Sequence, residues 1–490
     1  MVAPHTRRRK NFHFAVYNKE PLCLHFLMRA IIPHSVKVFE RGVGETFFKK
    51  FPPHTPKNRV FKKGVFMENP RAVALNVLNR CAAAEQYSNL ALDTALKRSE
   101  LTEADRGLLT ALVYGVIEKQ MTLDHWIGRL ASRPREEIDL PTQNLLRMGL
   151  YQMAFLDRVP DHAAVHETVS LAPKRTRGFV NAVLRAFGRS GKNLPLPDPN
   201  SDPVSYLSVK YSFAPAICET FADQFGFERT ETLLDAFHQQ PPLTLRVNTL
   251  KRTREAFLEQ LIAEGYGAAT TVESGSGICL SGAPVARLPG FAEGEFFVQD
   301  EASQLCVEAL DARPGMTVID ACACPGSKSF GAAIDMKNEG RVISCDLHAN
   351  KLSLVKSGAE RLGISIVETV ARDAREPNPA WVGVADRVLC DVPCSGFGVF
   401  AKKPELRYKD PAKSAGLPDI QLAILQNAST FVKSGGQLVY STCTLLPAEN
   451  EDNVARFLQT NGDFVLLRQR TLYPDIDGTD GFFFAVLKRN

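Results

Sequence analysis

The chain has 490 residues, of which 44% are hydrophobic and 23% charged, the balance expected of a globular protein with two to four domains. No apolar run reaches the roughly 18 residues that a membrane span needs, so no membrane segment is expected. Eleven cysteines, an odd number, without a secretory signal predict reduced thiols and a cytoplasmic location rather than a disulfide framework.

The formal net charge of +5 is unevenly distributed. Residues 1–66 contain 14 lysines and arginines and 3 acidic residues, a net +11, which leaves the other 424 residues with 45 basic and 51 acidic side chains, a net −6. Nucleic acid, if bound, should therefore contact local basic patches. The first segment lacks periodicity. A transit peptide, a basic nucleic-acid-binding arm, and upstream sequence preceding a natural start at Met67 are the three interpretations, and we favour the third.

From Asn69 to about residue 190 apolar residues recur at helical spacing, and no strand pattern interrupts them. Thr102-Glu-Ala-Asp105 predicts a capped helix start, and further helices are expected over about 143–155, 161–171 and 177–189. The segment 67–190 is therefore predicted to be an all-α bundle.

Two features of this bundle bear on function. His162 and His166 have the i, i+4 spacing of zinc ligands on one helix face, but no third ligand lies nearby, so ordinary helix residues are the favoured interpretation. A basic stripe follows, and it is either a solvated helix face or a surface that binds RNA phosphates. Its candidate RNA-binding residues are Lys174, Arg175, Arg177 and Arg185.

Residues 191–204 are predicted to be a linker, because four prolines fall within residues 191–203. Residues 205–295 then predict a small α+β module, with a strand over Leu243–Asn248 and a helix after it. Arg246 and Asn248 are expected to point outward from that strand, either as RNA contacts or as ordinary exposed polar residues.

In residues 296–490 apolar strand-like runs alternate with helical segments, which predicts a doubly wound, mostly parallel α/β sheet. The expected strands are Thr317–Asp320, Arg341–Cys345, Ile366–Val370, Asp386–Cys390, Gln437–Ser441 and Phe482–Leu487. Acidic residues at or just after strand ends should face one crevice at the carboxyl edge of the sheet; these are Asp320, Asp346, Asp373 and Asp391.

The first of these strands ends in a tight Pro-Gly turn before a helix, a place where backbone N–H groups and the helix dipole face a ligand. The turn lacks both the dinucleotide fingerprint and the phosphate loop, whereas Asp346, twenty positions after Gly326, is placed to hold a ribose diol. A nucleoside without pyrophosphate fits, which favours S-adenosylmethionine. The predicted cofactor loop comprises Cys322, Ala323, Cys324, Pro325, Gly326, Ser327 and Lys328.

Two later strands are each followed by a cysteine, Cys394 in Asp391-Val-Pro-Cys-Ser-Gly and Cys443 in Ser441-Thr-Cys. A thiolate that adds to carbon 6 of a pyrimidine makes carbon 5 nucleophilic enough to attack a methyl sulfonium. A base must then remove the carbon 5 proton. Cys443, Cys394 and Asp391 supply a nucleophile, a basic group and a carboxyl for this chemistry.

The other cysteines have simpler interpretations. Cys306, Cys345 and Cys390 are expected to be small buried hydrophobic residues. A zinc site built from Cys322, Cys324, Cys390 and Cys394 is disfavoured because their spacings do not match the usual two-residue separation, so no metal is predicted.

These motifs resemble the NOL1/NOP2/Sun family of RNA cytosine-5 methyltransferases, and within it the bacterial ribosomal RNA small subunit methyltransferase B (Sun) proteins. The resemblance covers about Met67 to Asn490. The markers are Asp391-Val-Pro-Cys-Ser-Gly, Ser441-Thr-Cys443, Val298-Gln-Asp-Glu-Ala-Ser303 and Asp480-Gly-Phe-Phe.

The resemblance implies a NusB-like helical domain, an RNA-recognition module and a Rossmann-like methyltransferase domain. It implies Cys443 as nucleophile, Cys394 in product release, Asp346 at the ribose, Asp373 near the adenine and Asp391 between cofactor and base. The implied substrate is one cytosine of 16S ribosomal RNA, and a monomer is expected.

The sequence departs from the family pattern at Cys324, Ser327 and Ser329 in the cofactor loop and at Phe397 after Cys394. The added Cβ of Ser327 puts cofactor affinity in question, and Phe397 does the same for the fit of the base. Two rival hypotheses are a DNA cytosine methyltransferase with Cys394 as nucleophile, and a non-catalytic RNA-binding assembly factor with a degenerate cofactor pocket.

Overall fold

The computed structural model describes residues 68–84, 88–239, 241–281 and 285–490, so the three interpretations of residues 1–66 lie outside the described residues. The first described part is helical, as predicted, with no strand between residues 68 and 189 among those described. Thr102 caps its helix by accepting the Asp105 N–H. The helices are α1 (Pro70–Ala84), α2 (Ser88–Arg98), α3 (Glu103–Glu118), α4 (Gln120–Leu130), α5 (Leu140–Phe155), α6 (Asp161–Leu171) and α7 (Lys174–Arg189), with a 3-10 turn η1 (Arg135–Glu137).

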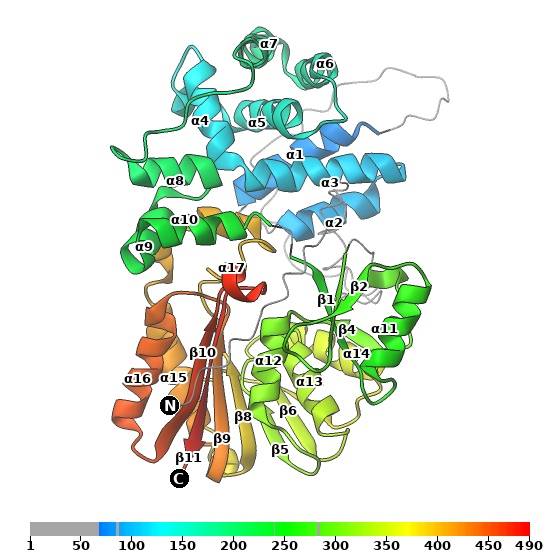
Figure 1. Cartoon of the computed structure of the whole chain (residues 1–490), viewed down its shortest axis with the longest axis vertical. Helices are drawn as coiled ribbons and strands as arrows, with labels where there is room; N and C mark the ends of the chain where they lie inside the picture. Colours follow the sequence, from blue (N-terminus) through cyan, green and yellow to red (C-terminus); the bar gives the residue numbers. More distant parts are fainter. Residues whose placement is uncertain (1–67, 85–87, 240, 282–284) are drawn as a thin grey trace, which may run out of the picture.

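Three further helices, α8 (Pro203–Tyr211), α9 (Pro215–Phe225) and α10 (Phe227–Ala236), lie between this bundle and the catalytic half (Figure 1). They pack around Phe400, whose ring centroid is 5.0 Å from those of both Phe213 and Phe237. Phe397 is fully buried and stacks on Phe400 at 5.5 Å. Phe397, which the sequence analysis treated as a question for base fit, is therefore a core residue of this aromatic cluster.

A small antiparallel sheet follows, with strand order β2-β3-β1-β4. The prediction that Arg246 and Asn248 point outward from this sheet is wrong, because both side chains are fully buried. Arg246 pairs with Asp335 at 2.7 Å, and Asn248 donates to the carbonyls of Gly294 and Leu362, both at 2.9 Å. Arg246 is therefore no RNA contact. The elements are β1 (Leu243–Val247), α11 (Arg254–Ala263), β2 (Ala268–Thr270), β3 (Gly277–Leu280), η2 (Val285–Arg287) and β4 (Phe296–Val298).

The catalytic half contains a seven-stranded sheet of order β10-β11-β9-β8-β5-β6-β7. The strands from β9 to β7 in this order are parallel, and β11 pairs antiparallel with both β9 and β10. All six predicted strands are present, and β10 is an addition. The strands are β5 (Thr317–Asp320), β6 (Arg341–Asp346), β7 (Val367–Ala371), β8 (Ala385–Asp391), β9 (Val432–Thr442), β10 (Phe464–Leu472) and β11 (Phe482–Arg489).

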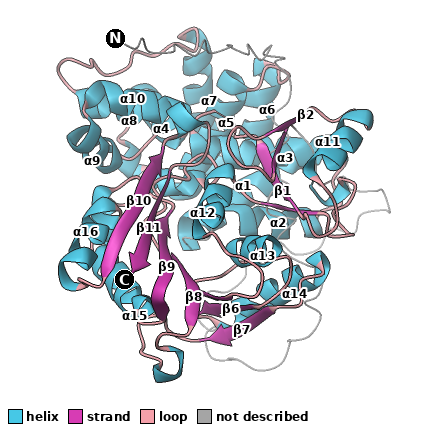
Figure 2. Cartoon of the chain, turned by 60° about the horizontal axis from the view of Figure 1, so that its bottom comes forward, coloured by secondary structure: helices cyan, strands magenta, loops and turns pink. Residues whose placement is uncertain are grey.

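Helices cover both faces of this sheet (Figure 2). Successive residues of a strand point to opposite faces, so Val318 packs in one apolar cluster and Ile319 in the other. Burial on both faces explains why the central strands read as continuous apolar runs. One face carries α12 (Glu301–Leu310), α13 (Ser327–Asp335) and α14 (Leu352–Leu362), and the other carries α15 (Leu417–Ser429) and α16 (Glu451–Thr460). The remaining pieces are α17 (Pro474–Asp477), η3 (Ala349–Lys351), η4 (Pro379–Trp381), η5 (Pro404–Tyr408), η6 (Pro411–Ser414) and η7 (Pro447–Glu449).

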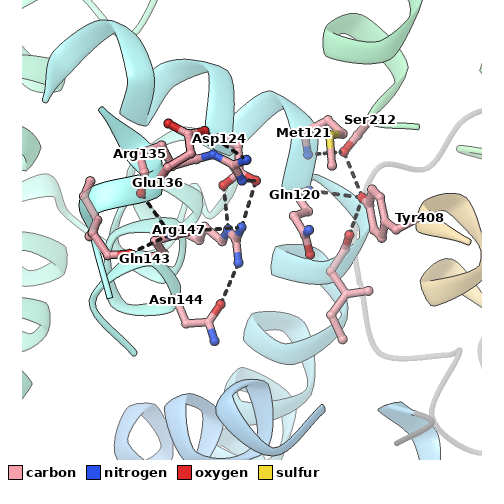
Figure 3. Close-up of polar contacts among 12 residues, drawn as sticks. Gln120, Met121, Asp124, Arg135, Glu136, Gln143, Asn144, Arg147, Ser212 and Tyr408 are labelled. Atoms are coloured by element: carbon pink, nitrogen blue, oxygen red, sulfur yellow. Dashed lines mark hydrogen bonds and ion pairs between the residues drawn. The ribbon is translucent and has the colours of Figure 1, made fainter. Parts of the chain in front are cut away.

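The helical bundle is joined to the catalytic half through Tyr408, at the end of η5 (Figure 3). Its hydroxyl donates to the carbonyl of Ile117 at 2.5 Å, accepts the Gln120 N–H at 3.2 Å and lies 2.9 Å from the hydroxyl of Ser212. Burial raises its pKa to about 12. The loop that leaves β8 is thus anchored in the helices. Over the described residues, no helix is long and apolar enough to cross a membrane.

Candidate active site

Cys394 and Cys443 lie side by side at the carboxyl edge of the large sheet. Strands β8 and β9 are parallel neighbours with Asp391 in register with Ser441, so the loops that follow them start at one level. The two sulfurs are 3.1 Å apart, and the Cys443 N–H points to the Cys394 sulfur at 3.3 Å. The prediction that both thiols meet at this edge is confirmed.

The two sulfurs have opposite electrostatic preferences. A hydrogen bond from Cys394 lowers the pKa of Cys443 against the opposing effect of burial, and the positive charges of Lys403 and Lys328 assist. The same hydrogen bond, together with burial and the charge of Glu449, raises the pKa of Cys394. The lysine charges therefore favour a thiolate at Cys443, and the charge of Glu449 disfavours one at Cys394.

Lys328 extends from the start of α13 to Asp391 at the end of β8. Its Nζ is 2.5 Å from Asp391 Oδ2, while the Ser441 hydroxyl donates to Oδ1 at 2.8 Å. Burial opposes the charge on Lys328, but the Asp391 carboxylate raises its pKa above the ordinary value. Sequence reasoning placed Lys328 only in the cofactor loop, because nothing along the chain indicates that its ammonium group meets Asp391.

The turn after β5 is held by Asp320, the last residue of that strand, whose side chain is 1% exposed. The Ser329 hydroxyl donates to Asp320 Oδ2 at 2.6 Å and accepts from the Ser344 hydroxyl at 2.8 Å. Burial raises the pKa of Asp320 to about 7. Ser329, a departure from the family's threonine, thus supplies a hydroxyl donor at this position, as a threonine would.

The predicted cofactor loop wraps the carboxyl ends of β5 and β6. The Ala323 N–H donates to the Cys345 carbonyl at 2.7 Å, and Gly326 precedes α13 with φ at 112°. A Cβ at Gly326 would collide with the ring of Phe330, so the turn requires glycine. Burial raises the pKa values of Cys322 and Cys324, which is consistent with thiols that are not nucleophiles here.

Two acidic residues follow the next strands along the same edge of the sheet. Asp346 ends β6, is partly exposed, and accepts the His348 N–H at 2.8 Å through Oδ1. Asp373 follows β7 and pairs with Arg375 at 2.6 Å, and hydrogen bonds from that arginine lower its pKa to about 2. A carboxylate at Asp346 and the helix start at Ser327 provide polar groups that suit a nucleoside, so the residues present fit the predicted cofactor.

The basic stripe lies on α7, at the end of the helical bundle that is away from β8 and β9 (Figure 1). All four of its predicted RNA-binding residues are exposed, and two of them, Arg177 and Arg185, line a cavity of about 810 Å³ with α6 residues that include His162 and His166. Within the described part of the chain no group of three or more potential metal ligands gathers around these histidines or around Cys322, Cys324, Cys390 and Cys394.

Sequence reasoning missed a buried charged cluster next to the Cys394 loop. Lys402 Nζ lies 2.5 Å from Asp300 Oδ2 and 2.7 Å from Asp480 Oδ2. Burial and the charge of Asp300 raise the pKa of Asp480 to about 6. The two acids belong to the motifs Val298–Ser303 and Asp480–Phe483, which the sequence analysis noted only as family markers, and their contact with Lys402 explains why they are close in space.

Comparison with known proteins gives a consistent result. Family profiles described as NusB, RsmF/B ferredoxin-like domain and 16S rRNA methyltransferase RsmB/F match residues 68–189, 217–286 and 307–488. A Bacillus subtilis protein named "Probable ribosomal RNA small subunit methyltransferase B" is 38% identical over 86% of this chain and 98% of its own length. A Synechocystis protein of the same name is 36% identical over 86% of this chain and 100% of its own length. The solved structure of PH0851 superposes with a TM-score of 0.72 at 26% identity, covering 86% of this chain and 99% of the other.

Proposed function

Because this chain belongs to the ribosomal RNA small subunit methyltransferase B family, we propose that it methylates carbon 5 of a cytosine in small subunit (16S) ribosomal RNA, with Cys443 as the nucleophile. The observation that carries the proposal is the pair of sulfurs 3.1 Å apart, next to the Lys328–Asp391 ion pair. A thiolate beside a proton-bearing thiol and a carboxylate is the set of groups that pyrimidine C5 chemistry needs.

S-adenosylmethionine would supply the electrophilic methyl group when bound. Asp346 would hold its ribose and Asp373 would lie near its adenine. The turn Cys322–Lys328 would face the methionine part, and Asp391 would lie between cofactor and base. These assignments are the ones that the family resemblance implies, and the strands whose ends carry them, β8, β5, β6 and β7, are consecutive neighbours in the sheet.

The reaction divides into two stages at the cysteines. The Cys443 thiolate would form a bond to carbon 6, and the displaced electron pair would make carbon 5 nucleophilic enough to take the methyl group that bound S-adenosylmethionine would supply, with the cofactor sulfur leaving as a neutral thioether. The carbon 5 proton then passes to the Cys394 sulfur, which has released its own proton to solvent. The C–H electron pair restores the C5–C6 double bond, and the Cys443–C6 bond breaks with its electrons returning to sulfur. Each turnover releases one proton.

We favour the RNA methyltransferase over the two rival hypotheses. A DNA-type enzyme needs Cys394 as the thiolate, but the pKa of Cys394 is raised and that of Cys443 lowered. A degenerate cofactor pocket was suggested by Ser327, yet the adjoining Gly326 turn and the Asp320–Ser329 contact are intact.

The basic residues of α7 are proposed to bind the RNA outside the catalytic crevice. Lys174, Arg175, Arg177 and Arg185 are exposed because the opposite face of α7, with Val180, Val183, Leu184 and Phe187, packs into the bundle core. Exposed arginine side chains on one helix face suit phosphate contacts.

Covalent capture tests the proposal. The full chain is incubated with S-adenosylmethionine and an unmodified 16S ribosomal RNA transcript, and protein–RNA adducts are resolved on a denaturing gel. Cys443→Ala should form no adduct, whereas Cys394→Ala should form one that persists, because only the release step is blocked. An adduct that survives Cys443→Ala but not Cys394→Ala would refute the assignment. Mapping 5-methylcytosine in the transcript identifies the target base.

A further inference from the structure

Residues on both sides of Cys394 are held by two buried side chains, Gln421 and Glu449. Gln421 Nε2 donates to the carbonyl of Pro393 at 2.9 Å, and Glu449 Oε2 accepts the N–H of Ser395 at 2.9 Å. Gln421 Nε2 also donates to Glu449 Oε2 at 2.7 Å. The two side chains therefore form one connected brace around the Cys394 backbone.

The brace is itself fixed in the core on the α15 and α16 face of the sheet. Gln421 is fully buried and Glu449 is 1% exposed. The Tyr440 hydroxyl donates to the Glu449 backbone carbonyl at 2.6 Å, and Asn453 Nδ2 donates to Gln421 Oε1 at 3.1 Å. Because both side chains are locked by these contacts, they can define the position of the Cys394 sulfur.

The brace also brings charge to the site. Glu449 Oε2 accepts two N–H donors, while Oε1 is buried and without a hydrogen-bond partner among the described residues. Its negative charge acts on Cys394, whereas two lysines act on Cys443. The titratable groups close to the two sulfurs include Lys328, Asp391, Lys403, Lys409, Tyr440 and Glu449, with the thiols of Cys306 and Cys390 beyond them.

We propose that Glu449 and Gln421 are positioning residues for the methyl transfer: they fix Cys394 against Cys443 and keep the proton of the pair on Cys394 until Cys443 has bonded to the base. The inference rests on the proposed function, because release is the step in which Cys394 acts. Gln421 supplies the position and Glu449 both the position and the charge. The division of roles between the cysteines thus depends on a residue six positions beyond the nucleophile.

Alkylation of the free full-length protein tests the charge without any RNA. The rate at which iodoacetamide modifies Cys394 is followed against pH by peptide mass spectrometry. Glu449→Gln keeps the size of the side chain and an oxygen acceptor for Ser395, so the midpoint for Cys394 should fall by about one pH unit. Glu451→Gln is the matched control, because it removes an equal charge from a carboxylate that accepts from the Thr471 hydroxyl and not from the Cys394 loop. Glu449→Asp retains the charge, so its pH midpoint for Cys394 alkylation should lie close to that of the parent chain.

Release from RNA tests the position. Gln421→Met removes the contact with Pro393 but no charge, so the covalent RNA adduct should persist severalfold longer while the alkylation midpoint stays near that of the parent chain. A Cys394 midpoint in Glu449→Gln equal to that in Glu451→Gln would overturn the charge role, and unchanged adduct lifetime in Gln421→Met would overturn the positioning role. If Cys394→Ala forms no adduct at all, the proposed function fails, yet the alkylation profiles still decide the inference on Glu449.

Discussion

Replacing Lys328 by methionine should raise the pKa of Cys443 and slow its reactions. Lys328 lies 2.5 Å from Asp391 and only 8% of its surface is exposed. Its charge lowers the pKa of Cys443, while that of Asp391 raises it, so the variant both loses a favourable charge and unmasks an unfavourable one. A net rise of about one unit is expected, which reduces the thiolate fraction about tenfold at pH values below the midpoint.

The variant should also lower stability modestly. Removing one partner of a fully buried ion pair costs about 3–5 kcal/mol, but the Asp391 side chain is 29% exposed to solvent, so roughly 1–2 kcal/mol is expected. Iodoacetamide alkylation of Cys443 against pH measures the first effect, and thermal melting the second. Lys356→Met, on the exposed side of α14, is the matched control.

The double variant Lys328→Met with Asp391→Asn provides the decisive comparison. With both charges gone, the Cys443 midpoint should return toward that of the parent chain, because the hydrogen bond from Cys394 is the main cause of the low pKa and stays in place. A Cys443 midpoint that is unchanged in Lys328→Met, or that rises further in the double variant, would refute the electrostatic reasoning.

Three other outcomes are expected. Ser327→Gly should tighten S-adenosylmethionine binding about fivefold by removing a Cβ at the start of α13, and calorimetric titration showing equal or weaker binding would contradict this. The paired variant Arg177→Ala with Arg185→Ala should weaken RNA binding across sequences and reduce the salt slope by about 2, whereas a slope equal to the parent's would exclude phosphate contacts. The Asp320 carboxyl binds its proton more tightly in the folded protein, so its contribution to stability is lost as pH rises from about 4 to about 7. The melting temperature of Asp320→Asn should therefore rise relative to that of the parent chain over this pH range, and not below it.

The strands of the large sheet were predictable because their burial is periodic and local. Val318 and Ile319 face opposite sides of a fully covered sheet, so an unbroken apolar run identified β5. Strand β10 was missed because it lies at the sheet edge and its middle, from Val465 to Gln469, is exposed, which leaves no apolar alternation. The strands β2 and β4, with three residues each, are too short for any periodicity to register.

The candidate site was predictable only where it follows strand order. Cys394 and Cys443 come directly after two strands, and strand ends of a parallel sheet share an edge, so their proximity was expected. The pairs Lys328–Asp391 and Gln421–Glu449 join segments 63 and 28 residues apart, and no local pattern encodes which side chains meet. The prediction for Arg246 was wrong for a related reason. Period-two spacing shows which face of a strand a residue lies on, but not which element covers that face, which here is α13 with Asp335.

The aromatic cluster around Phe400 has a practical consequence for dissecting the protein. A fragment cut at the start of the methyltransferase domain would keep every residue of the catalytic pair, yet it would lose Phe213, Phe221 and Phe237, which cover the rings of Phe397 and Phe400. Those rings lie on the loop that carries Cys394, so truncation would expose a hydrophobic surface next to the reactive sulfur. Isolated catalytic fragments should therefore aggregate unless they begin ahead of α8, and a shortened enzyme is better designed from Asp202 onward.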